Sequence, residues 1–194
     1  HWLDIAGYAD SDGYNEKDAV RPWAYHYRDY AIRSLNDDKP WDQFIVEQLA
    51  GDELVAPPHR NLSEQDADRL IATGFLRMGP DGTGLSASNN DVARNAVVAE
   101  TIKIMSTSLL GLSVGCAQCH EHRYDPITQA DYYRHRALIE PAYDVQKWRQ
   151  PNARLVSLWS ESERLQAGAV AKEAKRLNQE RAKELEELAQ SFFE

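Results

Sequence analysis

Hydrophobic and polar positions recur with helical spacing over most of the chain. Between residues 21 and 36 the apolar positions return every three or four residues, and Pro22 suits a first helical turn. The pattern predicts a second helix that begins after Pro40 and ends at Gly51, and a third that begins near Ser63. The expected apolar faces are Trp23, Tyr27, Tyr30, Ala31 and Leu35, then Trp41, Phe44, Ile45 and Leu49, then Leu70, Ile71 and Phe75.

Further along, glycine, serine and asparagine over residues 79–90 predict a loop. A long helix is expected over 91–112 and a short one over 128–139, where Glu140-Pro141 ends it. Neither a strand pattern nor an internal repeat interrupts this series. The expected fold class is therefore mainly α.

From about residue 159 to 193 the sequence is rich in Ala, Glu, Lys and Arg, and its apolar stripe is thin. A stripe of this kind usually packs against a partner helix. We expect a helical domain over 1–145, followed over 146–194 by a linker and a charged helical arm. The arm, over 160–194, is a candidate coiled-coil strand, and we expect it to pack against a partner helix. Its stripe consists of Leu165, Ala169, Leu177, Leu185 and Leu188.

Composition narrows the class of protein. Of the 194 residues 42% are hydrophobic and 27% charged, which is ordinary for a globular chain. The net charge of −9 argues against nucleic-acid binding, which needs a basic face. No apolar run reaches the length of about 18 residues that a membrane span requires.

The strongest chemical signal is the stretch Cys116-Ala-Gln-Cys119-His120, which contains both cysteines of the chain. C-x-x-C-H is the attachment pattern of c-type haem. Two thiols bond to the two vinyl groups of one porphyrin, and the adjacent imidazole of His120 reaches the iron as the proximal ligand. The prediction is one covalent haem c per chain, in an electron-transfer or other redox domain.

Two other interpretations stay open for the same residues. A C-x-x-C redox pair is expected near a βαβ pattern, which is absent here. A structural zinc or iron site would use Cys116, Cys119, His120 and His122, since Cys₂His₂ is a common zinc set. With haem bound, His122 is better placed as a neighbour of the cofactor, and Arg123 suits a haem propionate.

Two features of the first quarter suggest further chemistry. Asp10 and Asp12, in a block with Asn15, Glu16 and Asp18, have ligand types of a calcium loop, although the EF-hand spacing is not matched. The dense aromatic residues indicate core, which would wall a haem pocket, or a stacking platform for sugars. They are Trp2, Tyr8, Tyr14, Trp23, Tyr25, Tyr27, Tyr30 and Trp41.

Many separate blocks, in order, resemble one family: the planctomycete cytochrome C-type domain of unknown function (DUF1549, PSCyt2). The resemblance covers roughly residues 1–160. The blocks are His1-Trp2-Leu3-Asp4, Tyr8 to Tyr14, Arg21-Pro22-Trp23, Tyr27 to Tyr30, Gln48 to Asp52, Ala72 to Phe75 and Cys116 to Gln129.

The resemblance implies a cytochrome-c-like helical haem domain in a larger exported protein of a planctomycete-like bacterium. The location implied is periplasmic or otherwise extracytoplasmic. Its partners would be a redox partner protein or other domains of the same parent, such as a DUF1553 (PSD1) domain. Because the family pattern continues before His1, we expect the chain to be a fragment.

The sixth ligand of the iron decides the function. A His or Met there gives an electron carrier, and an open position gives a haem enzyme such as a peroxidase. His1 ranks first because it lies in a family block, and His26, on an aromatic-rich helix, ranks second. The other candidates are His59, His122, His135, Met78 and Met105.

Overall fold

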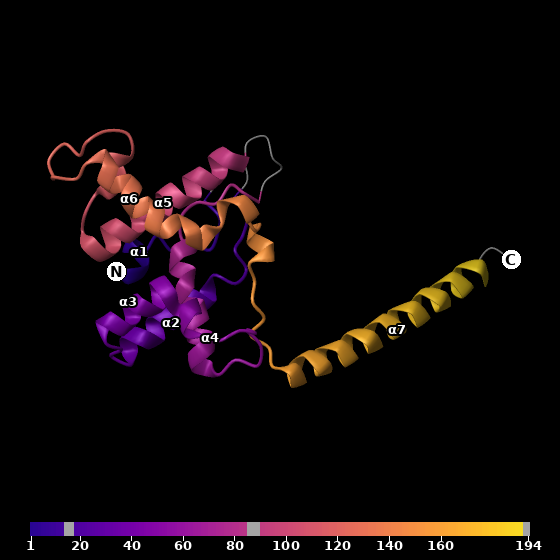
Figure 1. Ribbon diagram of the computed structural model, residues 1–194. Helices are drawn as coiled ribbons and strands as arrows, with labels where there is room; N and C mark the ends of the chain where they lie inside the picture. Colours follow the sequence, from indigo (N-terminus) through magenta and orange to yellow (C-terminus); the bar gives the residue numbers. More distant parts are fainter. Residues whose placement is uncertain (14–17, 85–89, 192–194) are drawn as a thin grey trace. The chain divides into compact units, whose positions relative to one another are not determined.

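The computed structural model describes residues 1–13, 18–84 and 90–191 (Figure 1). Within these ranges the chain is mainly helical, as predicted, and no strand forms beyond an isolated bridge between Ser11 and Val20. The chain divides into two compact units. One comprises His1–Ala56 with Glu64–Leu155, and the other Pro57–Ser63 with Val156–Glu194.

The helices follow the predicted pattern, with short 3₁₀ turns between them. In chain order they are α1 (Trp2–Ile5), α2 (Tyr25–Asn36), α3 (Trp41–Ala50), η1 (Gly51–Leu54), α4 (Glu64–Ala72), η2 (Thr73–Arg77), α5 (Asn90–Leu110), η3 (Val114–Gln118), α6 (Gln129–Ile139), η4 (Glu140–Tyr143), η5 (Val145–Lys147), η6 (Pro151–Ala153) and α7 (Glu161–Ser191). The helix predicted from residue 21 begins only at Tyr25, so Trp23 lies outside it and is 53% exposed.

Gly51 ends α3 as predicted, but for a different reason. Its φ of −60° is an ordinary right-handed value, so no left-handed cap is needed. A Cβ at this position would lie 2.1 Å from the carbonyl oxygen of Arg69. Glycine is therefore required because the backbone of α4 passes so closely.

The first core gathers the aromatic residues of α1, α2, α3 and η2. Trp2 packs edge-on against Phe44 at 5.1 Å and stacks on Phe75 at 5.6 Å between ring centroids. Its indole N–H donates to the Tyr27 hydroxyl at 2.9 Å, and Tyr27 donates to the Gln48 side-chain oxygen at 2.5 Å. The interior polar groups of this core are thus largely paired with one another.

A second core packs against the earlier turns of α5. Val97, Val98 and Ile102 of α5 meet Tyr132 of α6 and Ala117 of η3. The first core uses different α5 residues, among them Ile104, Met105 and Leu109. Figure 1 accordingly shows α5 and α6 side by side, and α5 serves as the wall common to both cores.

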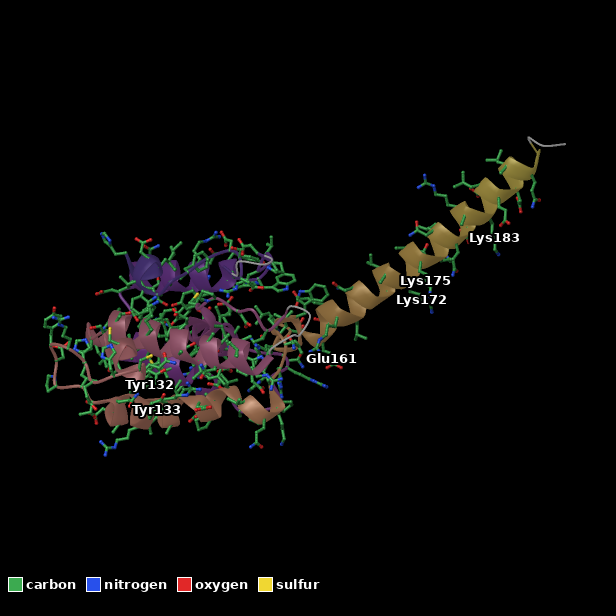
Figure 2. All side chains as sticks on the ribbon, turned by 90° about the horizontal axis from the view of Figure 1, so that it is seen from above. Tyr132, Tyr133, Glu161, Lys172, Lys175 and Lys183 are labelled. Atoms are coloured by element: carbon green, nitrogen blue, oxygen red, sulfur yellow. The ribbon has the colours of Figure 1, made fainter. Side chains whose placement is uncertain are left out.

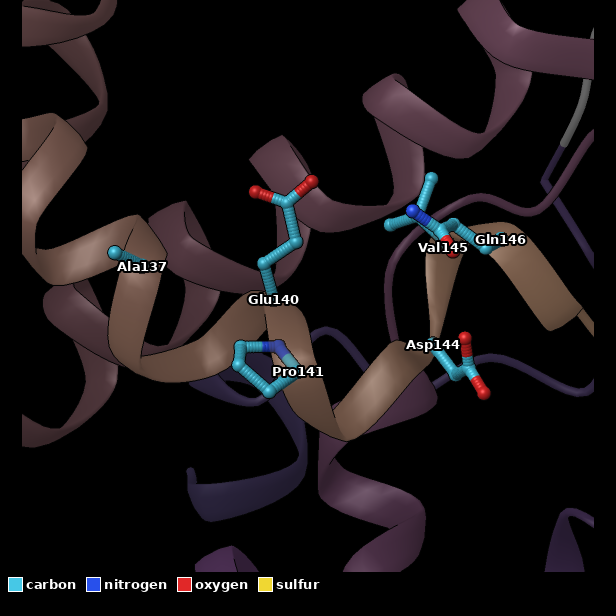
Figure 3. A pocket seen from close by; sticks show the side chains of 6 residues that line it. All are labelled: Ala137, Glu140, Pro141, Asp144, Val145 and Gln146. Atoms are coloured by element: carbon cyan, nitrogen blue, oxygen red, sulfur yellow. The ribbon is translucent and has the colours of Figure 1, made fainter.

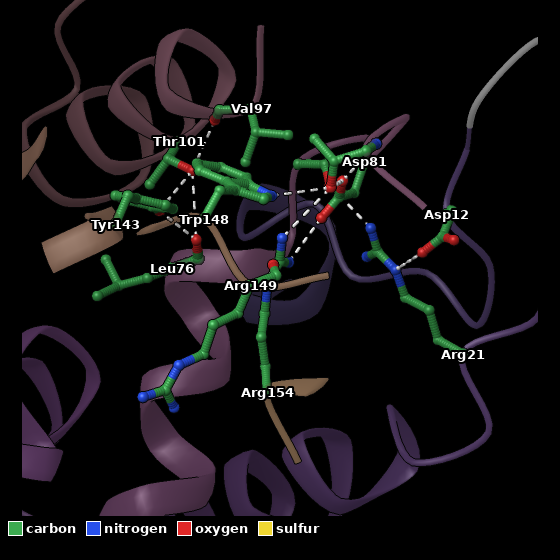
Figure 4. A network of polar contacts seen from close by, with 12 residues as sticks. Asp12, Arg21, Leu76, Asp81, Val97, Thr101, Tyr143, Trp148, Arg149 and Arg154 are labelled. Carbon is green, nitrogen blue, oxygen red and sulfur yellow. Dashed lines mark hydrogen bonds and ion pairs between the residues drawn. The ribbon is translucent and has the colours of Figure 1, made fainter. Parts of the chain in front are cut away.

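A polar network fixes the segment that follows α6 (Figure 4). The buried Asp81 carboxylate accepts hydrogen bonds from Thr83 and, at 2.7 Å, from Arg154. Trp148 donates to the Thr83 hydroxyl at 3.1 Å, and the Arg154 guanidinium lies 5.1 Å from the centre of the Trp148 ring. This network holds residues 144–155 against the loop that precedes α5.

The extended C-terminal helix is confirmed as α7, 31 residues long. At the first residue of α7, the Glu161 backbone N–H donates a hydrogen bond to Asn61 Oδ1 at 2.6 Å, and both residues belong to the second unit. Side chains stand off α7 along its length, Lys172, Lys175 and Lys183 among them (Figure 2). Leu177 and Leu188 of the predicted stripe are 51% and 56% exposed. None of the described helices combines the length and apolarity that crossing a membrane requires.

Candidate functional site

The C-x-x-C-H motif begins on the 3₁₀ turn η3, which follows α5 after three residues; Cys116 lies in the turn, and Cys119 is its C-terminal cap residue. Residues three apart share one side of such a turn. Val114 and Ala117 accordingly point into the second core, while Cys116 and Cys119 are both exposed and free. The turn thus packs inward through two apolar side chains, and the two exposed cysteines lie within it and at its C-terminal end.

His120 follows the second thiol and is also exposed. Its Nδ1 lies 2.7 Å from the carbonyl oxygen of Glu121. A carbonyl oxygen only accepts, so Nδ1 carries a proton, and in the neutral ring Nε2 keeps its lone pair. This is the ring state in which a histidine binds a metal through Nε2.

His122 lies in a different environment from His120. Its side chain is only 6% exposed. Nε2 is 2.9 Å from the Ser113 hydroxyl, and Nδ1 accepts the backbone N–H groups of Asp125 at 2.8 Å and Tyr124 at 3.3 Å. Both ring nitrogens are therefore engaged within the protein, which leaves neither free to bind an ion.

The zinc interpretation needs four converging ligands. Over the ranges that the structure describes, no group of three or more His, Cys, Asp and Glu side chains is placed to hold a metal ion. With His122 engaged on both nitrogens, the Cys₂His₂ set of the sequence is not assembled.

Helix α6 supports the motif through contacts that sequence reasoning missed. The Gln118 carbonyl accepts hydrogen bonds from the Gln129 side chain at 3.0 Å and from the Tyr133 hydroxyl at 3.3 Å. The Glu121 carboxylate accepts the Gln129 backbone N–H at 3.2 Å. The available signal was the start of α6, where Thr128 and Asp131 form a complete capping box.

Arg123, predicted to pair with a haem propionate, is exposed. Its guanidinium lies 5.7 Å from the centre of the Tyr124 ring, and that ring is itself 84% exposed. The side chain is thus at the surface of the motif loop, and its role toward a propionate stays a prediction.

The two preferred distal ligands are in different places. His1 caps α1, which packs against α5, and its side chain is fully exposed. His26 lies on α2, where its ring stacks on Tyr25 at 4.2 Å. Helix α2 packs against α1 and α4, whereas the motif turn packs against α5 and α6. Of the two, His1 is on the helix that shares a packing partner with the motif.

The other distal candidates differ in their placement. Met78 and Met105 are 8% and 5% exposed and belong to the first core. His59 lies in the second unit. His135 is on α6, and its Nε2 is buried with no hydrogen-bond partner. Of the aromatic residues predicted to wall a haem pocket, Trp2, Tyr27 and Tyr30 are buried in the first core, with Tyr8 packed against it, whereas the motif turn belongs to the second core. Trp23, Tyr25 and Trp41 are exposed.

The acidic block of the first quarter is already paired within the protein. Asp12 accepts from the Arg21 guanidinium at 2.7 Å, Asp10 accepts from the Tyr8 hydroxyl at 2.5 Å, and Asp18 accepts from the Gly13 N–H at 2.8 Å. Asn15 and Glu16 of the same block lie outside the described residues, as does Tyr14. A divalent ion near Asp10 and Asp12 stays a prediction.

A pocket of about 400 Å³ lies beside the end of α6 (Figure 3). Both of its carboxylates have protein partners. Glu140 accepts from Arg136 at 3.0 Å, and Asp144 accepts the Lys147 backbone N–H at 3.1 Å. No motif residue lines it. The remaining lining residues are Ala137, Pro141, Val145 and Gln146.

Comparison with known proteins gives one match. No curated protein and no solved structure matches the chain. A family model, PSCyt2, described as a protein of unknown function (DUF1549), matches residues 1–143 and so includes the motif and both cores. The chain therefore belongs to the PSCyt2 (DUF1549) family.

Proposed function

We propose that the motif turn attaches one haem c, and that the first unit is a redox domain of a larger exported protein. Cys116 and Cys119 would form the two thioether bonds, and His120 Nε2 would be the proximal iron ligand. The cofactor would supply one-electron chemistry at the iron. Attachment requires free thiols at the surface, and both cysteines are free and exposed.

One observation carries this proposal: two exposed, free cysteines three residues apart lie in and directly after one 3₁₀ turn, and an imidazole whose Nδ1 faces a carbonyl oxygen follows. The chemistry of this donor set fits haem c. Ala117 packs the turn into the second core, and Gln129 of α6 donates a hydrogen bond to the Gln118 carbonyl, so the protein keeps the donors in place. The PSCyt2 family name is in keeping with a cytochrome-like domain.

A second candidate function is small-molecule binding or turnover at an open distal position. Its support is the placement of the distal candidates. Met78 and Met105 are packed in the first core, and both nitrogens of His122 are engaged. A protein that leaves the sixth position open binds CO when reduced without displacing a side chain.

The test is a pyridine haemochrome spectrum of the denatured protein, with metal analysis of the same sample. The protein is produced with an export signal in a host that attaches haem c. A c-type spectrum that survives acid-acetone extraction, at one haem per chain, supports the proposal. Protein with two free thiols and no haem from such a host overturns it.

Two variants sharpen this test. Cys116→Ser with Cys119→Ser should abolish covalent attachment. His120→Ala should keep the thioether bonds but change the iron's coordination, seen as a shifted Soret band. His26→Ala removes the second-choice distal candidate and leaves the motif intact. A Soret band that shifts in His26→Ala and not in His120→Ala would contradict the assignment of His120.

A further inference from the structure

Ser113 and His122 bracket the motif and touch each other. Ser113 precedes η3 as its N-terminal cap residue, and His122 comes two residues after His120. The Ser113 hydroxyl and His122 Nε2 are 2.9 Å apart, across nine positions of sequence. The loop closed by this one contact contains both thiols and the imidazole of His120.

The hydrogen bonds of His122 determine its tautomer. Nδ1 faces two backbone N–H groups, those of Asp125 and Tyr124, and must accept from them. The single proton of the neutral ring is therefore on Nε2. It follows that Nε2–H donates to the Ser113 oxygen.

This tautomer excludes a hydrolase at the same residues. Ser113, His122 and Asp125 have the residue types of a serine-hydrolase triad, and Asp125 Oδ2 lies 3.4 Å from His122 Nδ1. A triad histidine must accept the serine proton on Nε2 and donate from Nδ1 to the carboxylate. In His122 the proton is on Nε2 and Nδ1 is the acceptor, which is the opposite arrangement, so His122 is not a base for Ser113.

The same histidine ties the loop to its other end. The His122 backbone N–H donates to the Ile127 carbonyl at 2.9 Å, and α6 begins at Gln129. On the opposite side, the Cys116 N–H donates to the Ser113 carbonyl at 3.0 Å. The contact between Ser113 and His122 thus joins the segment leaving α5 to the segment entering α6, with the motif between them.

We propose that Ser113 and His122 form a clasp whose function is to position the motif. The clasp fixes the loop before any cofactor binds, so the three donors do not lose that freedom on binding. His122 is a positioning residue and contributes no ligand. The role of the clasp toward a cofactor rests on the proposed function. The clasp itself can be tested on the protein with or without haem.

The first measurement is the ¹⁵N spectrum of the histidine rings in the unmodified protein. His122 should show a protonated Nε2 and an unprotonated Nδ1. The second is amide hydrogen exchange at Tyr124 and Asp125, whose N–H groups bind the ring. In Ser113→Ala and in His122→Asn these amides should exchange about tenfold faster, because the loop loses its cross-link.

Two controls separate the clasp from general destabilisation. Ser113→Thr keeps the hydroxyl and should restore slow exchange. Ser108→Ala removes a hydroxyl that bonds only its own helix, at 2.6 Å from the Ile104 carbonyl, and should leave Tyr124 and Asp125 unchanged. Exchange in Ser113→Ala that equals that in Ser108→Ala overturns the clasp, and so does a proton found on His122 Nδ1.

The loaded protein gives an independent readout. If the clasp positions the donors, Ser113→Ala should yield less covalent haem per chain than Ser113→Thr. Equal yields in the two variants overturn the positioning role. Absence of haem from the unmodified protein overturns the proposed function instead, and the exchange experiment still decides whether the clasp exists.

Discussion

Replacing Asp81 by Asn tests whether the polar network of Asp81, Thr83, Trp148 and Arg154 stabilises the first unit. Asp81 and Arg154 are 7% and 16% exposed at their side chains and 2.7 Å apart. The amide would turn an N–H₂ group or a neutral oxygen toward a guanidinium that is shielded from water. Breaking one side of a buried pair costs about 3–5 kcal/mol, because the remaining charge loses its partner.

The expected cost lies at the lower end of that range. Arg154 keeps two other acceptors, the Arg149 carbonyl at 2.7 Å and the Thr83 hydroxyl at 3.3 Å. We therefore expect a loss of about 3 kcal/mol in the free energy of unfolding. With a urea dependence of about 2 kcal/mol per molar, the unfolding midpoint moves down by roughly 1.5 M.

The assay is urea unfolding followed by tryptophan fluorescence, since Trp148 belongs to the network. Asp68→Asn is the matched control. It breaks the Arg33–Asp68 pair, whose side chains are 52% and 30% exposed, and should cost at most about 1 kcal/mol. The double variant Asp81→Asn, Arg154→Met should recover part of the loss, because no unpaired charge remains. Equal midpoints for Asp81→Asn and Asp68→Asn would refute the reasoning.

Three further predictions follow from burial and close packing. Burial alone would raise the pKa of Asp81, but its hydrogen bonds to Thr83 and Arg154 outweigh this effect and hold the pKa below 3.8. The stabilisation that the ionised carboxylate provides is therefore present above that pH and is lost on acidification below it. Asp81→Asn should remove this loss of stability at acid pH, measured as urea midpoints over a pH series. Gly51→Ala should lower the free energy of unfolding of the first unit by several kcal/mol in the same assay, because the added Cβ would collide with the Arg69 carbonyl oxygen. Gly168→Ala is the control: no atom lies within 4 Å of its added Cβ, so it should raise the helicity seen by circular dichroism and stabilise α7 by up to about 1 kcal/mol. Burial raises the pKa of five tyrosines, and it does so strongly for Tyr8, Tyr27 and Tyr30, so a titration at 295 nm should still lack the absorbance of these three at pH 11. The stabilising effect of the raised pKa values is present below pH 10 and is lost above it; complete ionisation of all tyrosines by pH 11 would contradict this. The five tyrosines are Tyr8, whose pKa is about 12, with Tyr27, Tyr30, Tyr132 and Tyr143.

The helices were predictable because their signals are local. Pro40 and Gly51 bound α3, and Thr128 caps α6 as its sequence indicates. The face of α2 was predicted less well. Leu35 has the right spacing but is 57% exposed, since spacing alone does not say how wide the buried stripe is.

The site was predictable as a motif but not as an arrangement. The spacing of Cys116, Cys119 and His120 identifies the donors, but it does not show which groups of the protein hold the His122 ring. The hydrogen bonds of that ring depend on Ser113, nine residues before His122, and on backbone N–H groups whose direction only the fold determines. Asp81 and Arg154 likewise meet across 73 positions, a separation that local patterns do not report.

The position of α5 between the two cores has a consequence for cooperativity. Successive turns of one helix belong to different cores, and Ile139 of α6 contacts both. Neither core can lose its packing without removing a wall of the other, so the aromatic half and the motif half of the first unit should unfold in a single transition. A peptide cut from the motif region would therefore lack the support that keeps its loop closed.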